Sequence, residues 1–288
     1  MERHAPARRR AAGYGGVPNA DIRLIRVFAI ASTALGGVPL SAELRSGSIA
    51  HYSHELLLTF AGACGVLGPK RSFLAPSGET PVAEHMLQAL GVPPGEQALR
   101  AVNAALIVAA DHDLASATLA ARIAASVGAG LHACIMAALA AQSGSALAGG
   151  CELVEELLHG IETEKRLKDR VREADQRRQR LPGFGLPLYP DGDPRARYLI
   201  QLALTIAPAS RQVELAAKFV DQVREKVGIH ANIEVGLATL TLALGLPRRA
   251  SGALWVVGRT AGWIAHVLEQ RRAGHMLRAR GHYVAQAY

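Results

Sequence analysis

Three arginines lie beside segments with a distinctive composition, and their side chains are suited to binding carboxylates. Arg195 follows the stretch RLPGFGLPLYPDGDP, which holds four prolines and three glycines in fifteen residues. A loop restricted in this way has little conformational freedom to lose when it holds a ligand. Arg259 and Arg278 flank the opposite ends of an apolar stretch, and a guanidinium can bind a carboxylate through two parallel hydrogen bonds. Three such groups could bind a di- or tricarboxylate, but surface arginines are common, so spacing alone favours ordinary solvated side chains.

Two groups of histidines are further candidates for chemistry. His112 stands between two aspartates, where a hydrogen-bonded turn histidine is more common than a ligand contact. His51 and His54, with Glu55, have the spacing of one helix face, but two ligands without a third make a weak metal site. We therefore predict no metal site.

The segments that must hold these residues have helical periodicity. No run of alternating β-branched residues is long enough for a strand, so the sequence predicts an all-α fold. The expected helices cover about residues 21–35, 49–64, 77–90, 98–110, 115–127, 131–142, 152–179, 196–207, 210–227, 234–244, 251–257 and 261–272.

Composition supports closely packed helices and excludes several classes of protein. Half of the 288 residues are apolar but only 5% are aromatic, so the core must consist of Ala, Leu, Val and Ile. The three cysteines are widely spaced, which argues against a disulfide framework and a zinc site and favours a cytoplasmic location. Residues 123–151 carry no charge, but glycines, His132 and a Gln-Ser-Gly-Ser run interrupt them. Two short buried helices explain this stretch better than a membrane span.

The net charge of +8 and the pI of about 9.8 would permit nucleic acid or anionic lipid as a partner. Part of the excess lies in residues 1–20, which have the composition of a disordered basic tail. The other dense stretch, EKRLKDRVREADQRR, alternates in sign and is typical of a solvated helix. No nucleic-acid-reading module is recognisable and few aromatics are available for stacking. We therefore expect no nucleic-acid and no membrane partner.

Several segments, in order, resemble the citrate synthase family. ADHDLASATLAARIAAS is similar to the family's DHE-x-NAST-x-AAR segment, PGFGLPLYPDGDPRA to its PGFGH…DPR loop, and GRTAGWIAHVLEQ to its GRTPGWIAH-LEQ segment. HANIEVGLATLTLALGLP and LRARGHYV resemble two further stretches. The resemblance covers about residue 111 to the C-terminus.

The resemblance implies an all-α fold with a large helical domain over residues 21–288 and a smaller lobe at about residues 160–258. Because the chain is shorter than typical members, part of the N-terminal helical region is expected to be missing. A two-fold homodimer, held by the apolar helices between Ile123 and Gln142 and by the C-terminal segment, would share its active-site residues. The family's substrate-binding positions fall on His112, on Arg195, on Arg259 and, from the partner subunit, on Arg278.

The family's catalytic positions are substituted. Its reaction is a Claisen condensation in which a carboxylate takes a proton from a thioester methyl group, one histidine stabilises the enol and another protonates the oxo-acid carbonyl. The base falls on Glu234, where the family has Asp, and the two histidines fall on Ala148 and Leu186. Neither Ala nor Leu can donate a hydrogen bond. His132, His159 and His230 are other histidines that could reach the site.

The leading interpretation is a citrate synthase-family protein that binds a di- or tricarboxylate and an acyl-CoA, with impaired or altered condensation of acetyl-CoA with oxaloacetate. No cofactor is expected to be tightly bound, and acetyl-CoA or another acyl-CoA is the expected substrate. One alternative is a citryl-CoA lyase or acyltransferase of changed specificity. Another is a non-catalytic metabolite sensor or a subunit that completes a partner's site.

Overall fold

The computed structural model describes residues 21–36, 40–43, 45, 48–77, 80–144, 150–177 and 181–281. Every regular element in these ranges is helical, which confirms the predicted all-α fold. The predicted basic tail of residues 1–20, and Ala148, lie outside the described residues. The elements are α1 (Asp21–Leu35), α2 (Leu40–Glu43), α3 (Ser48–Ala63), the short 3₁₀ helix η1 (Cys64–Val66), α4 (Val82–Leu90), α5 (Glu96–Ala110), α6 (Ser116–Ser126), α7 (Leu131–Gln142), α8 (Gly150–His159), α9 (Glu164–Arg177), α10 (Pro194–Ile206), α11 (Arg211–Val227), α12 (Ile233–Ala243) and α13 (Ala250–Ala273).

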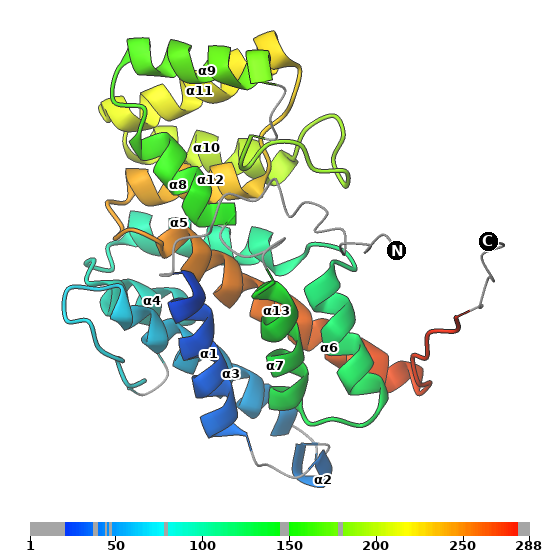
Figure 1. Cartoon of the computed structure of the whole chain (residues 1–288). Helices are drawn as coiled ribbons and strands as arrows, with labels where there is room; N and C mark the ends of the chain where they lie inside the picture. Colours follow the sequence, from blue (N-terminus) through cyan, green and yellow to red (C-terminus); the bar gives the residue numbers. More distant parts are fainter. Residues whose placement is uncertain are drawn as a thin grey trace, which may run out of the picture.

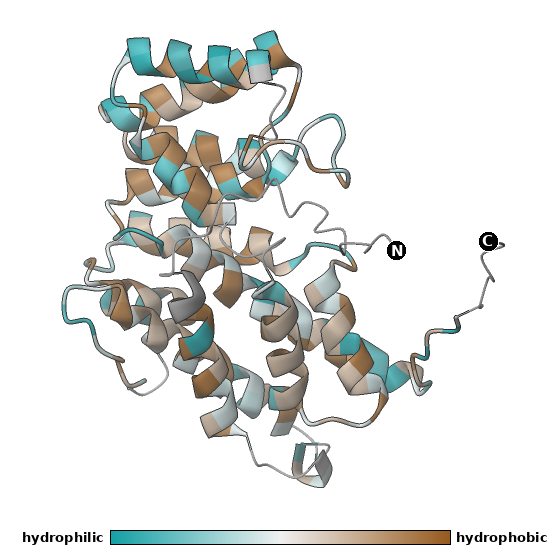
Figure 2. Ribbon diagram, viewed as in Figure 1, coloured by the Kyte–Doolittle hydropathy of each residue, from teal (hydrophilic) through white to brown (hydrophobic). Residues whose placement is uncertain are grey.

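The helices bury two hydrophobic clusters. Helices α8 to α12 stack at one end of the molecule, α1, α3, α4, α6 and α7 lie at the other, and α5 and α13 run between them (Figure 1). The smaller cluster draws its buried side chains from Val154 to Ala238, whereas α13 contributes to the larger one. Hydrophilic residues line α9 at the edge of the smaller group (Figure 2). The assignment of about residues 160–258 to a smaller lobe stays a prediction. Within the described residues, no helix is both long enough and apolar enough to cross a bilayer.

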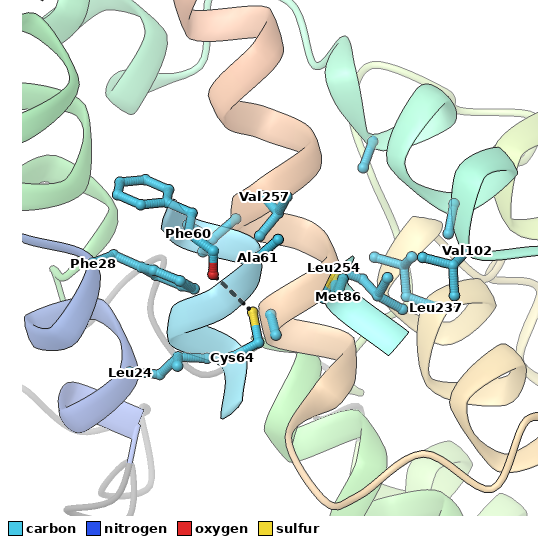
Figure 3. Close-up of a cluster of buried hydrophobic side chains, with 14 of the residues drawn as sticks. Leu24, Phe28, Phe60, Ala61, Cys64, Met86, Val102, Leu237, Leu254 and Val257 are labelled. Carbon is cyan, nitrogen blue, oxygen red and sulfur yellow. Dashed lines mark hydrogen bonds between the residues drawn. The ribbon is translucent and has the colours of Figure 1, made fainter. Parts of the chain in front are cut away.

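The larger cluster is built around α3 and α13. Phe28 of α1 and Phe60 of α3 pack with ring centroids 4.8 Å apart, and the Cys64 thiol donates a hydrogen bond to the Phe60 carbonyl at 3.2 Å. Figure 3 shows Leu254 and Val257 of α13 in the same cluster. All three cysteines are buried, and no disulfide joins any two of them. A core of small and aliphatic side chains lets these helices approach closely.

Helix α13 corrects the prediction of two helices at residues 251–257 and 261–272. It is continuous from Ala250 to Ala273, so Arg259 lies inside it rather than at an end. Gly258, which lies between the two predicted helices, and Gly262 both permit close packing of α13 against α5. A Cβ added at Gly258 would lie 2.7 Å from the Ala109 Cβ, and one added at Gly262 would lie 1.8 Å from the Ala110 oxygen. The sequence shows the glycines but not the neighbour that requires them.

The predicted helix over residues 152–179 is also wrong, because it is two helices. Helix α8 ends at His159, and α9 begins at Glu164 after the turn that contains Gly160. The hydroxyl of Thr163 accepts a hydrogen bond from the Arg166 N–H at 3.3 Å, as at a helix N-cap. Similarly, α4 begins at Val82, after Pro81, and not at residue 77. The signals for these ends are present in the sequence, as a glycine, a threonine and a proline.

Candidate functional site

Two of the three predicted arginines meet at the C-terminal end of α5. Arg259 of α13 donates through Nη1 to the Ala110 carbonyl and through Nη2 to the Thr118 hydroxyl, the latter at 2.7 Å. Arg195, in the first turn of α10, donates through Nη1 to the Asp111 carbonyl at 2.6 Å. The last carbonyls of a helix lack intrahelical donors and form the negative end of its dipole. Two guanidinium groups therefore stabilise the end of α5, next to His112.

His112 lies between these arginines. Its Nδ1 is 3.3 Å from Nη2 of Arg195, and its ring meets the Trp255 ring edge-on at a centroid distance of 4.9 Å. Burial, followed by the positive charges of Arg195 and Arg259, lowers the pKa of His112 to about 4. The imidazole is therefore neutral at physiological pH.

Asp193 is the residue that fixes Arg195. Its side chain is fully buried and accepts hydrogen bonds from Nε and Nη2 of Arg195 at 2.9 and 2.8 Å. It also caps α10 by accepting from the Arg195 backbone N–H at 3.0 Å, ahead of Pro194 at the first helical position. A further bond, 3.0 Å from the Ile233 N–H, joins it to the start of α12. One carboxylate thus connects Arg195 with the helix that carries Glu234.

Glu234, the residue predicted to stand at the family's base position, lies in the first turn of α12. The side-chain oxygen of Asn232 caps this helix by accepting from the Glu234 N–H at 2.9 Å. A Cβ added at Gly150 would lie 2.0 Å from a carboxylate oxygen of Glu234, so this carboxylate packs against the first residue of α8. Gly150 follows Ala148 by two positions. Glu234 is therefore held against the helix that begins directly after the Ala148 segment.

The loop that carries Leu186 is pinned through its backbone. The Gly185 N–H donates to the His230 carbonyl and the Asn232 N–H to the Gly183 carbonyl, each at 2.8 Å. Gly183 has a φ of +77°, and a Cβ there would meet side chains of α8 and α12 at 2.5 and 2.6 Å. Only glycine meets both requirements without strain. Leu186 itself is half-buried.

Of the remaining predicted residues that the structure describes, none belongs to this cluster. Arg278 is exposed, and the preceding Leu277 N–H donates to Ser126, at the opposite end of α6 from Thr118. Ala148 lies outside the described residues. His132 is buried, with its carbonyl bonded to Ser32 of α1, and His159 lies at the end of α8. His230 lies under the loop, its ring packed against Gly192.

Sequence reasoning missed four residues that shape the cluster. They are Asp193, Thr118, Trp255 and Tyr189, whose ring faces the Arg195 guanidinium at 5.0 Å. The Asp-Pro-Arg order signalled the helix cap, and Tyr189 lies in the loop that leads to its partner, six residues before Arg195. The partners of Thr118 and Trp255 are more than 140 residues away in sequence. In the described ranges, no group of three or more His, Cys, Asp or Glu side chains is arranged to hold a metal ion. The two guanidinium groups of the cluster are of the kind that binds organic anions.

A comparison with known families decides which protein family the chain belongs to. The family model described as "Citrate synthase, C-terminal domain" matches residues 17–280. The chain belongs to the citrate synthase family. Among curated relatives, citrate synthase 2 of Bacillus subtilis is 29% identical over 206 residues, which are 70% of this chain and 55% of that protein. Citrate synthase of Saccharolobus solfataricus is 33% identical over 205 residues, or 68% and 54%. The chain therefore spans about half the length of the curated relatives it matches.

Solved structures show the same fold. The citrate synthase of Thermoplasma acidophilum, in a ternary complex with carboxymethyl coenzyme A and oxaloacetate, aligns with a TM-score of 0.71 at 23% identity. The alignment covers 95% of this chain and 78% of that one. The citryl-CoA lyase of Hydrogenobacter thermophilus aligns with a TM-score of 0.61 at 24% identity, over 73% of this chain and 88% of that one. These citrate synthase-family neighbours establish the helical architecture.

Proposed function

We propose that this citrate synthase-family chain binds a di- or tricarboxylate at the end of α5 and an acyl-CoA beside it, and that it is impaired in condensation. The observation that carries the proposal is the convergence of His112, Arg195 and Arg259 on one helix terminus. The cluster offers two guanidinium groups and an imidazole where family resemblance expects oxo-acid contacts. A solved relative with the same fold holds carboxymethyl coenzyme A and oxaloacetate, which supports both ligand classes.

The proposed impairment follows from the chemistry of the condensation. A base removes a proton from the methyl group of acetyl-CoA, the resulting enol carbon forms a bond to the keto carbon of oxaloacetate, and water then releases coenzyme A from the thioester. Glu234 can serve as the base, but Ala148 and Leu186 offer no donor for the enol or the keto oxygen. Losing one preorganised donor costs about 10²- to 10³-fold in rate.

Calorimetric titration with citrate and with oxaloacetate tests the binding step. Arg195→Gln should weaken binding at least about 10-fold, since a hydrogen bond to a charged group contributes about 1.5–3 kcal/mol. Arg197→Gln, an exposed change on the same helix, removes the same charge and should leave affinity unchanged. Chloride at matched ionic strength controls for screening of the +8 charge. Equal affinities in the two variants would refute the site assignment.

Thioester release from acetyl-CoA with oxaloacetate tests turnover. Wild type should show little or no release, and a rate of about 1 to 10³ per second would exclude impairment. A citryl-CoA lyase remains a second candidate, because the alignment with that enzyme covers 88% of its chain. Citryl-CoA offered in place of the two condensation substrates would reveal that activity as release of acetyl-CoA.

We also propose that the chain forms a homodimer through α6. Leu119, Ile123 and Val127 recur every four residues on or directly after this helix and are 43%, 45% and 62% exposed. An apolar stripe of this kind requires burial. Sedimentation at micromolar concentration should give a dimer, and Ile123→Glu should give a monomer. Ile107→Glu, at an exposed apolar position on α5, is the control, and a monomeric wild type would contradict the proposal.

A further inference from the structure

We propose that His112 donates a hydrogen bond from Nε2 to the keto oxygen of the bound oxo acid, and that Arg195 holds it in the required tautomer. This inference rests on the proposed function, because it needs an oxo acid in the site. It assigns to His112 the carbonyl-polarising contact that Leu186 cannot make. The argument depends on which protons the two side chains carry.

The contact with Arg195 fixes the tautomer. A guanidinium has five N–H donors and no acceptor. The Nδ1 atom of His112, 3.3 Å from Nη2 of Arg195, must therefore present its lone pair. A neutral imidazole that accepts at Nδ1 carries its proton at Nε2. No described residue is recorded as a hydrogen-bond partner of that Nε2.

Arg195 cannot turn away from this contact without breaking others. Its Nε and Nη2 pair with the buried carboxylate of Asp193, and its Nη1 donates to the Asp111 carbonyl. Four of its five N–H groups are thus committed within the protein, counting the bond to His112. One N–H of Arg195 is left for a ligand, so this arginine alone cannot bind a carboxylate through two hydrogen bonds in this arrangement.

The surrounding charges keep His112 neutral. The charged groups around it are Arg195 and Arg259, which oppose protonation, and Asp193 and Asp111, which favour it. Burial adds to the effect of the arginines, so the pKa lies near 4. A neutral imidazole donates a hydrogen bond without transferring its proton, and such groups polarise carbonyls in other enzymes. The charged guanidinium groups are better matched to the carboxylates of the same ligand.

Nuclear magnetic resonance of the full chain, labelled with ¹⁵N-histidine, tests the tautomer without any ligand. Long-range proton–nitrogen correlations should show His112 with a protonated Nε2 and an unprotonated Nδ1, unchanged between pH 8 and about pH 5. The signals among the eleven histidines are assigned by their loss in His112→Asn. Arg195→Gln should restore a mixture of tautomers and Arg197→Gln should not. An Nδ1–H tautomer, or titration near pH 6.5, would overturn the proposal.

The same sample tests the donor role. Oxaloacetate should move the Nε2 proton signal of His112 downfield and should itself show a downfield shift at a ¹³C-labelled keto carbon. Succinate, which has two carboxylates and no carbonyl between them, should bind without moving the Nε2 proton. Oxaloacetate binding with neither shift would refute the donor role and leave the proposed function intact. If neither acid binds, the proposed function and the donor role both fall, and only the tautomer assignment survives.

Discussion

The binding side and the reaction side of the site are built differently. On the predicted binding side, Arg195 contacts His112 and Asp193, and Arg259 donates to the Ala110 carbonyl at the end of α5. The Asp193 carboxylate also caps the start of α10. On the predicted reaction side, the resemblance places the two family histidines at Ala148 and Leu186, and Glu234 is the one acidic residue among the three predicted positions. The difference teaches that the arginines predicted to bind the ligand also stabilise helix ends. We therefore expect the fold to tolerate substitution at positions 148 and 186 better than at the two arginines.

Restoring the reaction side should produce the largest effect. Ala148→His together with Leu186→His should raise thioester release from acetyl-CoA and oxaloacetate by about 10²-fold over wild type, because each imidazole supplies a donor at the family position. Adding Glu234→Asp should raise it further by shortening the reach of the base. The control pairs Ala148→His with Leu188→His, an exposed position in the same loop. An equal gain in the control would show that placement of the imidazole is irrelevant.

Breaking the binding side should instead cost stability. Asp193→Ala leaves the buried Arg195 without its partner and should lower the free energy of unfolding by about 3–5 kcal/mol. Leu186→Ala on the reaction side removes a half-buried side chain and should cost only about 1 kcal/mol. Asp169→Ala, in an exposed pair with Arg172, should cost at most about 1 kcal/mol. Urea denaturation measures the free energy of unfolding of all three variants. Similar losses in Asp193→Ala and Leu186→Ala would show that the two sides of the site contribute equally to stability.

A smaller effect tests how the close packing of α13 against α5 positions Arg259. Gly262→Ala should lower the free energy of unfolding by about 1–3 kcal/mol, because the added methyl group meets the Ala110 carbonyl. Helix propensity alone predicts the opposite sign, a gain of up to about 1 kcal/mol. Thermal denaturation decides between them. A stabilised variant would mean that α5 and α13 can separate freely at this point.

The sequence predicted the all-α fold and named three residues that the structure brings to the end of α5, whose role in binding stays a prediction. It did not predict the contacts that organise them. Helical periodicity located most helices, because it is a local property of the chain. It divided α13 at Gly258 and joined α8 to α9 across Gly160, because a glycine inside a helix and a glycine after one look alike without their neighbours. Asp193 was missed for a similar reason. The Ile233 N–H that helps to bury it is 40 residues away.

The loop before α10 has a consequence for protein engineering. Its anchors to residues 230–232 are formed by main-chain atoms, and its tight approach to α8 and α12 is made by a glycine. Side chains at positions 186 to 188 can therefore be varied with little effect on the path of the chain. A saturation library at these three positions would explore new reactivity on a rigid platform while leaving Asp193 and its bonds in place.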